Sequence, residues 1–168
     1  MDKDLPAILK LVPDAITPAG TRYTSGFGLV TAENGLSPIG PPWSSLTAYD
    51  LNRGTIKWKI ALGDVPDLAA KGVKNTGSHY PKVGPVVTAG GLLFAGTRDR
   101  TVRAFDVETG KVVWEREVDA ALEGIPGIYE IDGREFIVFC ASAQAGLTPA
   151  TQGTISGGYV ALSLPASR

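Results

Sequence analysis

Cysteine, histidine and net charge are all scarce in this sequence, and each scarcity excludes a class of protein. Among 168 residues there are one cysteine and one histidine, and the net charge is −1. A single cysteine cannot form an intrachain disulfide, and a single histidine without clustered carboxylates predicts no metal site. A near-neutral chain has no electrostatic basis for binding nucleic acid or an anionic membrane surface.

Long apolar runs are also missing. No run approaches the ~20 residues that a membrane-spanning helix needs. The opening MDKDLPAILKLVPDA lacks the basic region and the apolar stretch of a secretory signal. We therefore expect no transmembrane segment in this chain. The run FIVFCA contains Cys140, and we expect a buried, inert thiol because no partner or base adjoins it. The redox state of the compartment stays open.

Glycine and proline are abundant, at 21 and 12 residues. Both residues interrupt regular structure, so their number indicates many turns with short strands between them. Apolar residues make up 43% of the chain, an ordinary value for a globular protein. The length suits one domain or slightly more.

One sequence pattern occurs twice in register. Residues 48–58 read AYDLNRGTIKW and residues 104–114 read AFDVETGKVVW, so Trp58 and Trp114 are 56 positions apart. A period slightly above 50 residues fits a four-stranded propeller blade with one long insertion. Each copy predicts a β-hairpin, because its aspartate can accept backbone N–H bonds and its glycine supplies the positive φ of a bulged turn. We expect both indoles to pack against a neighbouring blade.

The repeat predicts an all-β fold, a partial β-propeller of about three four-stranded antiparallel blades. Residues 84–118 spell one complete blade, and residues 125–165 begin another but supply only three strands. Residues 21–62 form the first blade, with weak early strands, and residues 1–20 are an N-terminal extension. Because a short arc leaves open sheet edges, we expect it to associate with the remaining blades of a propeller or with itself.

Three segments resemble a known family. PPWSSLTAYDLNRGTIKWKIALGD, GPVVTAGGLLFAGTRDRTVRAFDVETGKVVWE and GYVALSLP resemble the C-terminal blades of quinoprotein dehydrogenases, which depend on pyrroloquinoline quinone (PQQ). The nearest group is the membrane-bound glucose dehydrogenase type, and the resemblance covers about residues 21–165. It implies part of an eight-bladed propeller that, when complete, holds PQQ and calcium or magnesium and oxidises a sugar or alcohol. It also implies a location in the periplasm or on the periplasmic side of a membrane.

The resemblance implies where the cofactor would lie. The segment NTGSHYPKVG precedes the innermost strand of a blade, and in the family it passes close to the quinone. The residues expected to bond to the quinone or its carboxylates, or to stack on it, are Asn75, Thr76, Ser78, Lys82 and Tyr80. In the family the catalytic carboxylate and the metal ligands lie in earlier blades. We therefore expect no catalytic or metal-binding residue here, and no PQQ held by this chain alone beyond weak affinity.

Three further features each allow two interpretations. Trp43, which follows two prolines, stacks on the cofactor or anchors packing, and packing is favoured. His79 is a ligand or an exposed loop histidine without a role, and the second interpretation is favoured. The charged turn at residues 98–100 (RDR) is expected to be a solvated surface rather than a functional cluster.

Three functions are compatible with these features. The first is the C-terminal part of a PQQ-dependent dehydrogenase that oxidises a sugar or alcohol and is inactive by itself. The second is a non-catalytic propeller-repeat scaffold or assembly module, and the third is a sugar-binding module that uses the same axial loops. The NTGS segment and the PPW loop favour the first, because a scaffold has no reason to retain cofactor-facing loops.

Overall fold

The computed structural model describes residues 30–79, 82–142 and 157–163, which form three antiparallel sheets. Within each sheet, neighbouring strands are also consecutive in the sequence. The elements are β1 (Ser45–Asp50), β2 (Thr55–Ala61), α1 (Pro66–Ala69), β3 (Val86–Val87), β4 (Leu92–Gly96), β5 (Thr101–Asp106), β6 (Val112–Glu117), β7 (Ala121–Ile131), β8 (Arg134–Ser142) and β9 (Gly158–Ser163).

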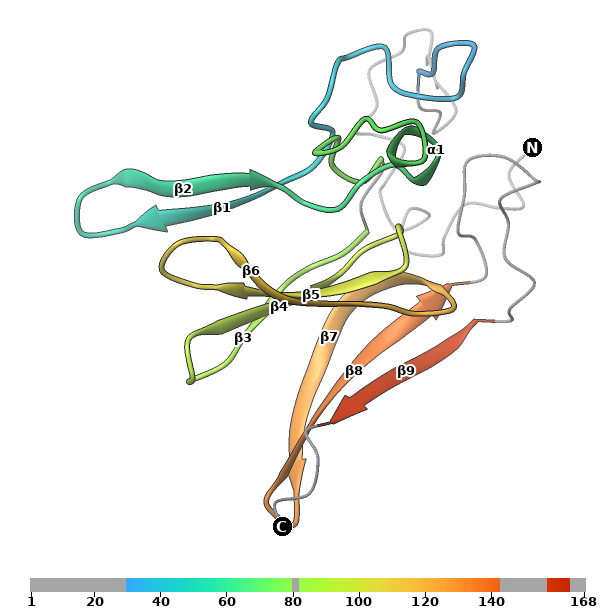
Figure 1. Cartoon of the computed structure of the whole chain (residues 1–168). Helices are drawn as coiled ribbons and strands as arrows, with labels where there is room; N and C mark the ends of the chain where they lie inside the picture. The colour runs from blue at the N-terminus through green and yellow to red at the C-terminus, as the bar shows by residue number, and fades with distance from the viewer. Residues whose placement is uncertain (1–29, 80–81, 143–156, 164–168) are drawn as a thin grey trace, which may run out of the picture.

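The sheets follow one another as successive layers. Figure 1 shows the middle sheet, β3 to β6, between the β1–β2 hairpin and the third sheet, β7 to β9. The middle sheet has four strands and the third has three in the described part of the chain. This arrangement confirms the predicted all-β fold, with sheets stacked as the blades of a partial propeller.

The two copies of the repeat share one structural irregularity. In each hairpin, the alanine that opens the pattern pairs with the tryptophan that closes it, and the register shifts immediately after that alanine (Ala48 and Ala104). A bulge at this point increases the local twist and bends both hairpins in the same way. Equivalent positions in the two copies can therefore be compared directly.

Two small cores fill the spaces between the sheets. The buried residues of the first core, between the β1–β2 hairpin and the middle sheet, are Leu46, Leu62, Leu93, Ala95 and Phe105. Those of the second core, between the middle and third sheets, are Val102, Leu122, Ile137 and Phe139. Since successive side chains of a strand point to opposite faces, β5 supplies Val102 to one core and Phe105 to the other. The middle sheet is thus held from both sides.

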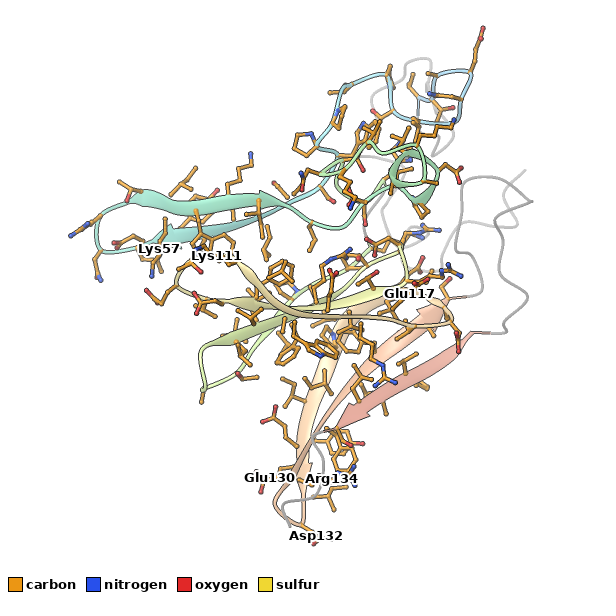
Figure 2. The ribbon with its side chains drawn as sticks, in the orientation of Figure 1. Lys57, Lys111, Glu117, Glu130, Asp132 and Arg134 are labelled. Carbon is orange, nitrogen blue, oxygen red and sulfur yellow. The ribbon has the colours of Figure 1, made fainter. Side chains whose placement is uncertain are left out.

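Trp58 joins the first sheet to the second, as the repeat predicted. Its indole N–H donates to the carbonyl oxygen of Val107 at 2.9 Å. The ring lies so close to Gly110 that a Cβ there would come within 2.7 Å of two indole carbons. An ion pair between Lys57 and Glu108 flanks this contact, and Figure 2 shows Lys57 beside the β5–β6 hairpin. The prediction of an inter-blade tryptophan is confirmed at this position.

Trp114, the equivalent residue of the second copy, is covered less well. Its side chain is 42% exposed. It lines a cavity of about 490 Å³ between the middle sheet and the strands β8 and β9. The expectation that Trp114 packs against the neighbouring blade as Trp58 does is therefore not confirmed, since the indole borders a cavity and is partly exposed.

The prediction that Cys140 is buried was wrong, because its thiol is exposed. Along β8, Ile137 and Phe139 point toward the middle sheet and are buried. Cys140 comes next in the alternation and points to the opposite face, which is uncovered in the described part of the chain. The uninterrupted apolar run suggested a strand buried on both faces, whereas only one of its faces is packed.

Some elements differ from those predicted from the sequence. The third sheet begins at Ala121 rather than near residue 125, because β7 continues through a register irregularity between Glu123 and Gly127. The short helix α1 follows the first hairpin and was not predicted. In the first sheet the described strands are β1 and β2. The proposed extension at 1–20, and residues 21–29, lie outside the described residues.

We predict that Gly110→Ala destabilises the chain more than Gly54→Ala, the same change at the equivalent turn. Both glycines have positive φ, 70° and 66°, so each alanine bears a left-handed strain of about 1–2 kcal/mol. Only at Gly110 would the new Cβ meet an indole, since nothing lies within 4 Å of a Cβ at Gly54. Overpacking of this kind adds about 1–3 kcal/mol. Urea unfolding measures the difference, and equal midpoints for the two variants would contradict the inter-blade contact.

Candidate functional site

The segment 75–79 (NTGSH) runs into the interior between the first and second sheets. Thr76 and Ser78 are each 1% exposed. The Ser78 N–H donates to the carbonyl of Leu62 at 2.8 Å, and the Trp43 N–H donates to the carbonyl of Thr76 at 2.8 Å. A Cβ at Gly77 would lie 2.5 Å from backbone atoms of Ser44, so this close approach requires glycine.

Three hydrogen bonds join Thr76 to Asp64 and Val65. Its N–H donates to Oδ1 of Asp64 at 2.9 Å, and its hydroxyl donates to the same oxygen at 3.2 Å. The hydroxyl also accepts the N–H of Val65 at 2.8 Å. Such side-chain bonds to backbone hold loops in one conformation. The Thr76 side chain is thus occupied in fixing the segment to the end of the first sheet.

The same network continues into the middle sheet. The N–H of Asp64 donates to Oδ2 of Asp99 at 3.0 Å. Asp99 in turn receives two hydrogen bonds from the guanidinium of Arg103, at 2.8 and 3.2 Å, and its side chain is 8% exposed. Removing the partner of a buried carboxylate is strongly destabilising, because the remaining charge is left uncompensated away from water. The turn at 98–100 was expected to be a solvated surface; at Asp99 this was wrong, because the carboxylate is buried by its partners.

Trp43 and His79 meet edge to face. Their ring centroids are 5.4 Å apart and the ring planes are inclined by 79°. The indole N–H of Trp43 donates to the carbonyl of Ile39 at 2.6 Å. Trp43 is half-buried, in keeping with its favoured role as a packing anchor, but it also lies beside the NTGSH segment.

His79 is buried, at 7% exposure, and not an exposed loop residue as expected. Its Nε2 accepts the backbone N–H of Ser37 at 2.7 Å, so that nitrogen carries no proton. Burial lowers the pKa of His79, and the positive charge of Arg98 lowers this pKa further. The neutral imidazole therefore fastens the 30–44 loop, and with it Trp43, to the NTGSH segment.

Five of the six predicted site residues are described, and their positions divide them into two groups. Thr76 and Ser78 lie in the interior, where Thr76 is bound by Asp64 and Val65, and the half-buried Trp43 lies next to them. Asn75, at the start of the segment, and Lys82, three residues beyond its end, are exposed. Tyr80 lies outside the described residues.

Asp64 and the structural role of His79 were not predicted from the sequence. Asp64 follows the first hairpin without a recognisable motif, and only a search for a carboxylate partner of the buried Thr76 could have found it. Arg98 also lies at this end of the sheets, where its guanidinium is 3.5 Å from the carboxylate of Glu123 at the start of the third sheet.

In the described part of the chain no group of three or more potential metal-ligating side chains occurs. Nor does that part contain a helix long and apolar enough to span a bilayer.

Comparison with known proteins gives a family and several relatives. The family described as PQQ glucose/ethanol/alcohol dehydrogenase, β-propeller domain, matches residues 10–137. A protein named "Probable quinate dehydrogenase (quinone)" from Xanthomonas campestris pv. juglandis is 33% identical over 162 residues, which covers 90% of this chain and 19% of the relative. Quinoprotein glucose dehydrogenase of Escherichia coli (strain K12) is 32% identical over 155 residues, covering 86% and 19%.

A solved structure has a similar fold. A europium-containing methanol dehydrogenase superposes with a TM-score of 0.52 at 24% identity, covering 71% of this chain and 23% of that one. At this identity the likeness concerns the fold. The chain spans about a fifth of the length of the sequence relatives it matches.

We predict that His79→Gln reduces the loss of stability on acidification. The pKa of His79 is lower in the folded state than in the unfolded state, so the unfolded state binds more protons at mildly acidic pH. The free energy of unfolding therefore falls as the pH drops from the unfolded pKa, about 6.5, toward the lower folded pKa. The glutamine carbonyl can still accept the Ser37 N–H but does not titrate. His79 is the only histidine, so urea midpoints between about pH 7.5 and pH 5.5 isolate its effect. An unchanged pH dependence in the variant would contradict this assignment.

Proposed function

This chain belongs to the PQQ glucose/ethanol/alcohol dehydrogenase β-propeller family, and we propose that it forms the C-terminal blades of such a propeller and one wall of its quinone site. The buried NTGSH segment carries this proposal. It is fixed by Thr76, Asp64 and Asp99 at the end of the sheets where the inter-blade loops gather. Loops held rigidly on a scaffold are the usual carriers of binding residues.

The exposed side chains at this end have chemistry that suits the cofactor. PQQ carries three carboxylates and an ortho-quinone, so it calls for cations, amide donors and a flat apolar surface. Lys82 and Asn75 offer an ammonium and an amide on the surface of the segment. Trp43 adds an indole beside it. Thr76 and Ser78, whose side chains point inward, would position the segment rather than touch the quinone.

When bound, PQQ supplies the two-electron acceptor for oxidation of a hydroxyl group. The residues proposed here would bind and orient the cofactor and would exclude water from one side of it. The described residues include no cluster suited to a metal ion, so the cation of the complete site would rely on residues from elsewhere in the propeller. The chain alone is accordingly proposed to be inactive.

The remaining parts of the proposal follow from the family. One relative is named for quinate and another for glucose, and the two are nearly equally identical to this chain, at 33% and 32%. A polyhydroxylated sugar or sugar-like acid is therefore the proposed substrate class. The remaining blades of the propeller are the proposed partner. We place the assembled protein in the periplasm or at the periplasmic face of a membrane.

The proposal predicts weak PQQ binding that depends on Lys82. Lys82→Gln removes a charge facing the carboxylates of PQQ, which at an exposed site is worth about 0.5–1 kcal/mol, or roughly two- to fivefold in affinity. Lys59→Gln, on the exposed strand β2, makes the same change in net charge away from the site. Isothermal titration with PQQ measures both variants against the unaltered chain.

The outcome separates the proposal from a scaffold role. Equal loss in the two variants, or no heat of binding in the unaltered chain, would favour a non-catalytic propeller module. In a parallel assay with PQQ, calcium and glucose, we expect no reduction of an electron-accepting dye. Turnover by the chain alone would show that it is more than a part of the site.

A further inference from the structure

The outer part of the 30–44 loop, residues 30–42, is folded largely on itself. The N–H of Ala32 donates to the carbonyl of Leu36 at 2.8 Å, and the N–H of Gly35 donates to the carbonyl of Ala32 at 2.9 Å. The N–H of Ile39 donates to Oγ of Ser37 at 3.3 Å. The shape of this outer part is therefore set by its own turns rather than by the sheets.

One side chain connects the outer part to the rest of the molecule. Among the described residues, the only hydrogen bond from the outer part to a residue beyond position 44 runs from the Ser37 N–H to Nε2 of His79, at 2.7 Å. Trp43, whose indole N–H donates to the carbonyl of Ile39, rests edge to face on the same imidazole. Leu36 adds one buried apolar side chain. The hydrogen bond and the ring contact thus converge on a single titratable group.

Protonation of His79 is incompatible with this connection. A neutral imidazole can accept a hydrogen bond at one nitrogen, whereas both nitrogens of an imidazolium are donors. A protonated Nε2 would face the Ser37 N–H, which is also a donor. His79 is buried, so the new charge would in addition be held away from water. The imidazolium is better accommodated when the loop has moved away and water reaches the ring.

The charged groups near His79 favour the neutral imidazole. They are Glu33 on the loop and, on the neighbouring segments, Asp64, Lys82, Arg98, Asp99 and Glu123. The positive charge of Arg98 lowers the pKa of His79. Three of the carboxylates are bound to other residues: Asp64 to Thr76, Asp99 to Arg103 and Glu123 to Arg98. Glu33 and Lys82 are exposed to water.

We propose that His79 is a pH-sensitive latch: when its imidazole takes up a proton at Nε2, the outer part of the 30–44 loop detaches from the NTGSH segment while the three sheets remain folded. Because the pKa of His79 is lowered when the loop is closed, detachment begins below about pH 6.5. From there to the lower pKa of the closed loop, the ratio of open to closed loop rises up to about tenfold for each pH unit. The proposal concerns the loop and does not depend on quinone binding.

Hydrogen exchange of the full 168-residue chain, followed by NMR between about pH 7.5 and pH 5, tests the latch. The ring-proton signal of the only histidine gives the titration of His79 directly. Exchange rates are converted to protection factors, which removes the pH dependence of exchange in an unstructured chain. We expect the protection factor of the Ser37 amide to fall up to about tenfold per pH unit below pH 6.5. The amides of β4 and β5 should keep theirs.

Three variants separate the latch from a general loosening of the loop. His79→Gln keeps an acceptor for Ser37 but does not titrate, so its Ser37 protection should be high at every pH. His79→Phe keeps a ring beside Trp43 but has no acceptor, so its Ser37 protection should be low at every pH. Ser37→Ala loses the hydroxyl bond to Ile39 but keeps the N–H, so the amide of residue 37 should retain the pH dependence of the unaltered chain.

A matched pair of arginine variants tests the electrostatic part. Arg98→Met removes the charge that lowers the pKa of His79, so detachment should move to higher pH by about half a unit. Arg100→Met makes the same change in the same turn at a side chain paired with Glu117, and it should shift detachment less. This pair and His79→Gln still decide the question if His79→Phe does not fold.

Three results would each overturn the proposal. The first is a Ser37 protection factor that stays constant down to pH 5, whether or not His79 titrates. The second is the same pH dependence in His79→Gln as in the unaltered chain. The third is loss of protection at β4 and β5 in parallel with Ser37, which would mean that the whole chain unfolds. Failure of the PQQ titration would leave all of these readouts unaffected.

Discussion

The contact between Trp58 and the next hairpin is the interaction on which the stacking of the sheets depends. A large flat ring can seat there only because the facing residue, Gly110, has no Cβ and adopts a positive φ. The hydrogen bond to Val107 fixes the orientation of the ring. Hydrophobic burial alone is non-directional, so this contact supplies the specific register between neighbouring blades.

The candidate site depends on that register, because it is built across the seams between sheets. Thr76 and Asp64 belong to the end of the first sheet, whereas Asp99 and Arg103 belong to the middle sheet. A small shift of one blade against the other would separate a buried carboxylate from its partners, at a cost of several kcal/mol. The same polar network that positions the NTGSH segment therefore also locks the blades in place.

The arrangement of the NTGSH segment has a consequence for any ligand bound there. The hydroxyl-bearing residues that look most suited to bind a quinone are turned into the protein, and the exposed groups lie at the two ends of the segment. His79, unprotonated at Nε2, ties down a separate loop and with it Trp43. The shape of the site thus comes from buried polar bonds, while its surface chemistry comes from a few peripheral side chains.

The sequence by itself determined the hairpins, their repeat and the all-β fold, because turn residues and the alternation of strands are local properties. Through Trp58, it also located one inter-blade contact. Tertiary structure alone decided that Cys140 is exposed, that the Asp99 carboxylate and His79 are buried, and that Trp114 borders a cavity. The physical reason is that burial of a strand face depends on the sheet that lies opposite, and periodicity along one strand carries no information about that neighbour.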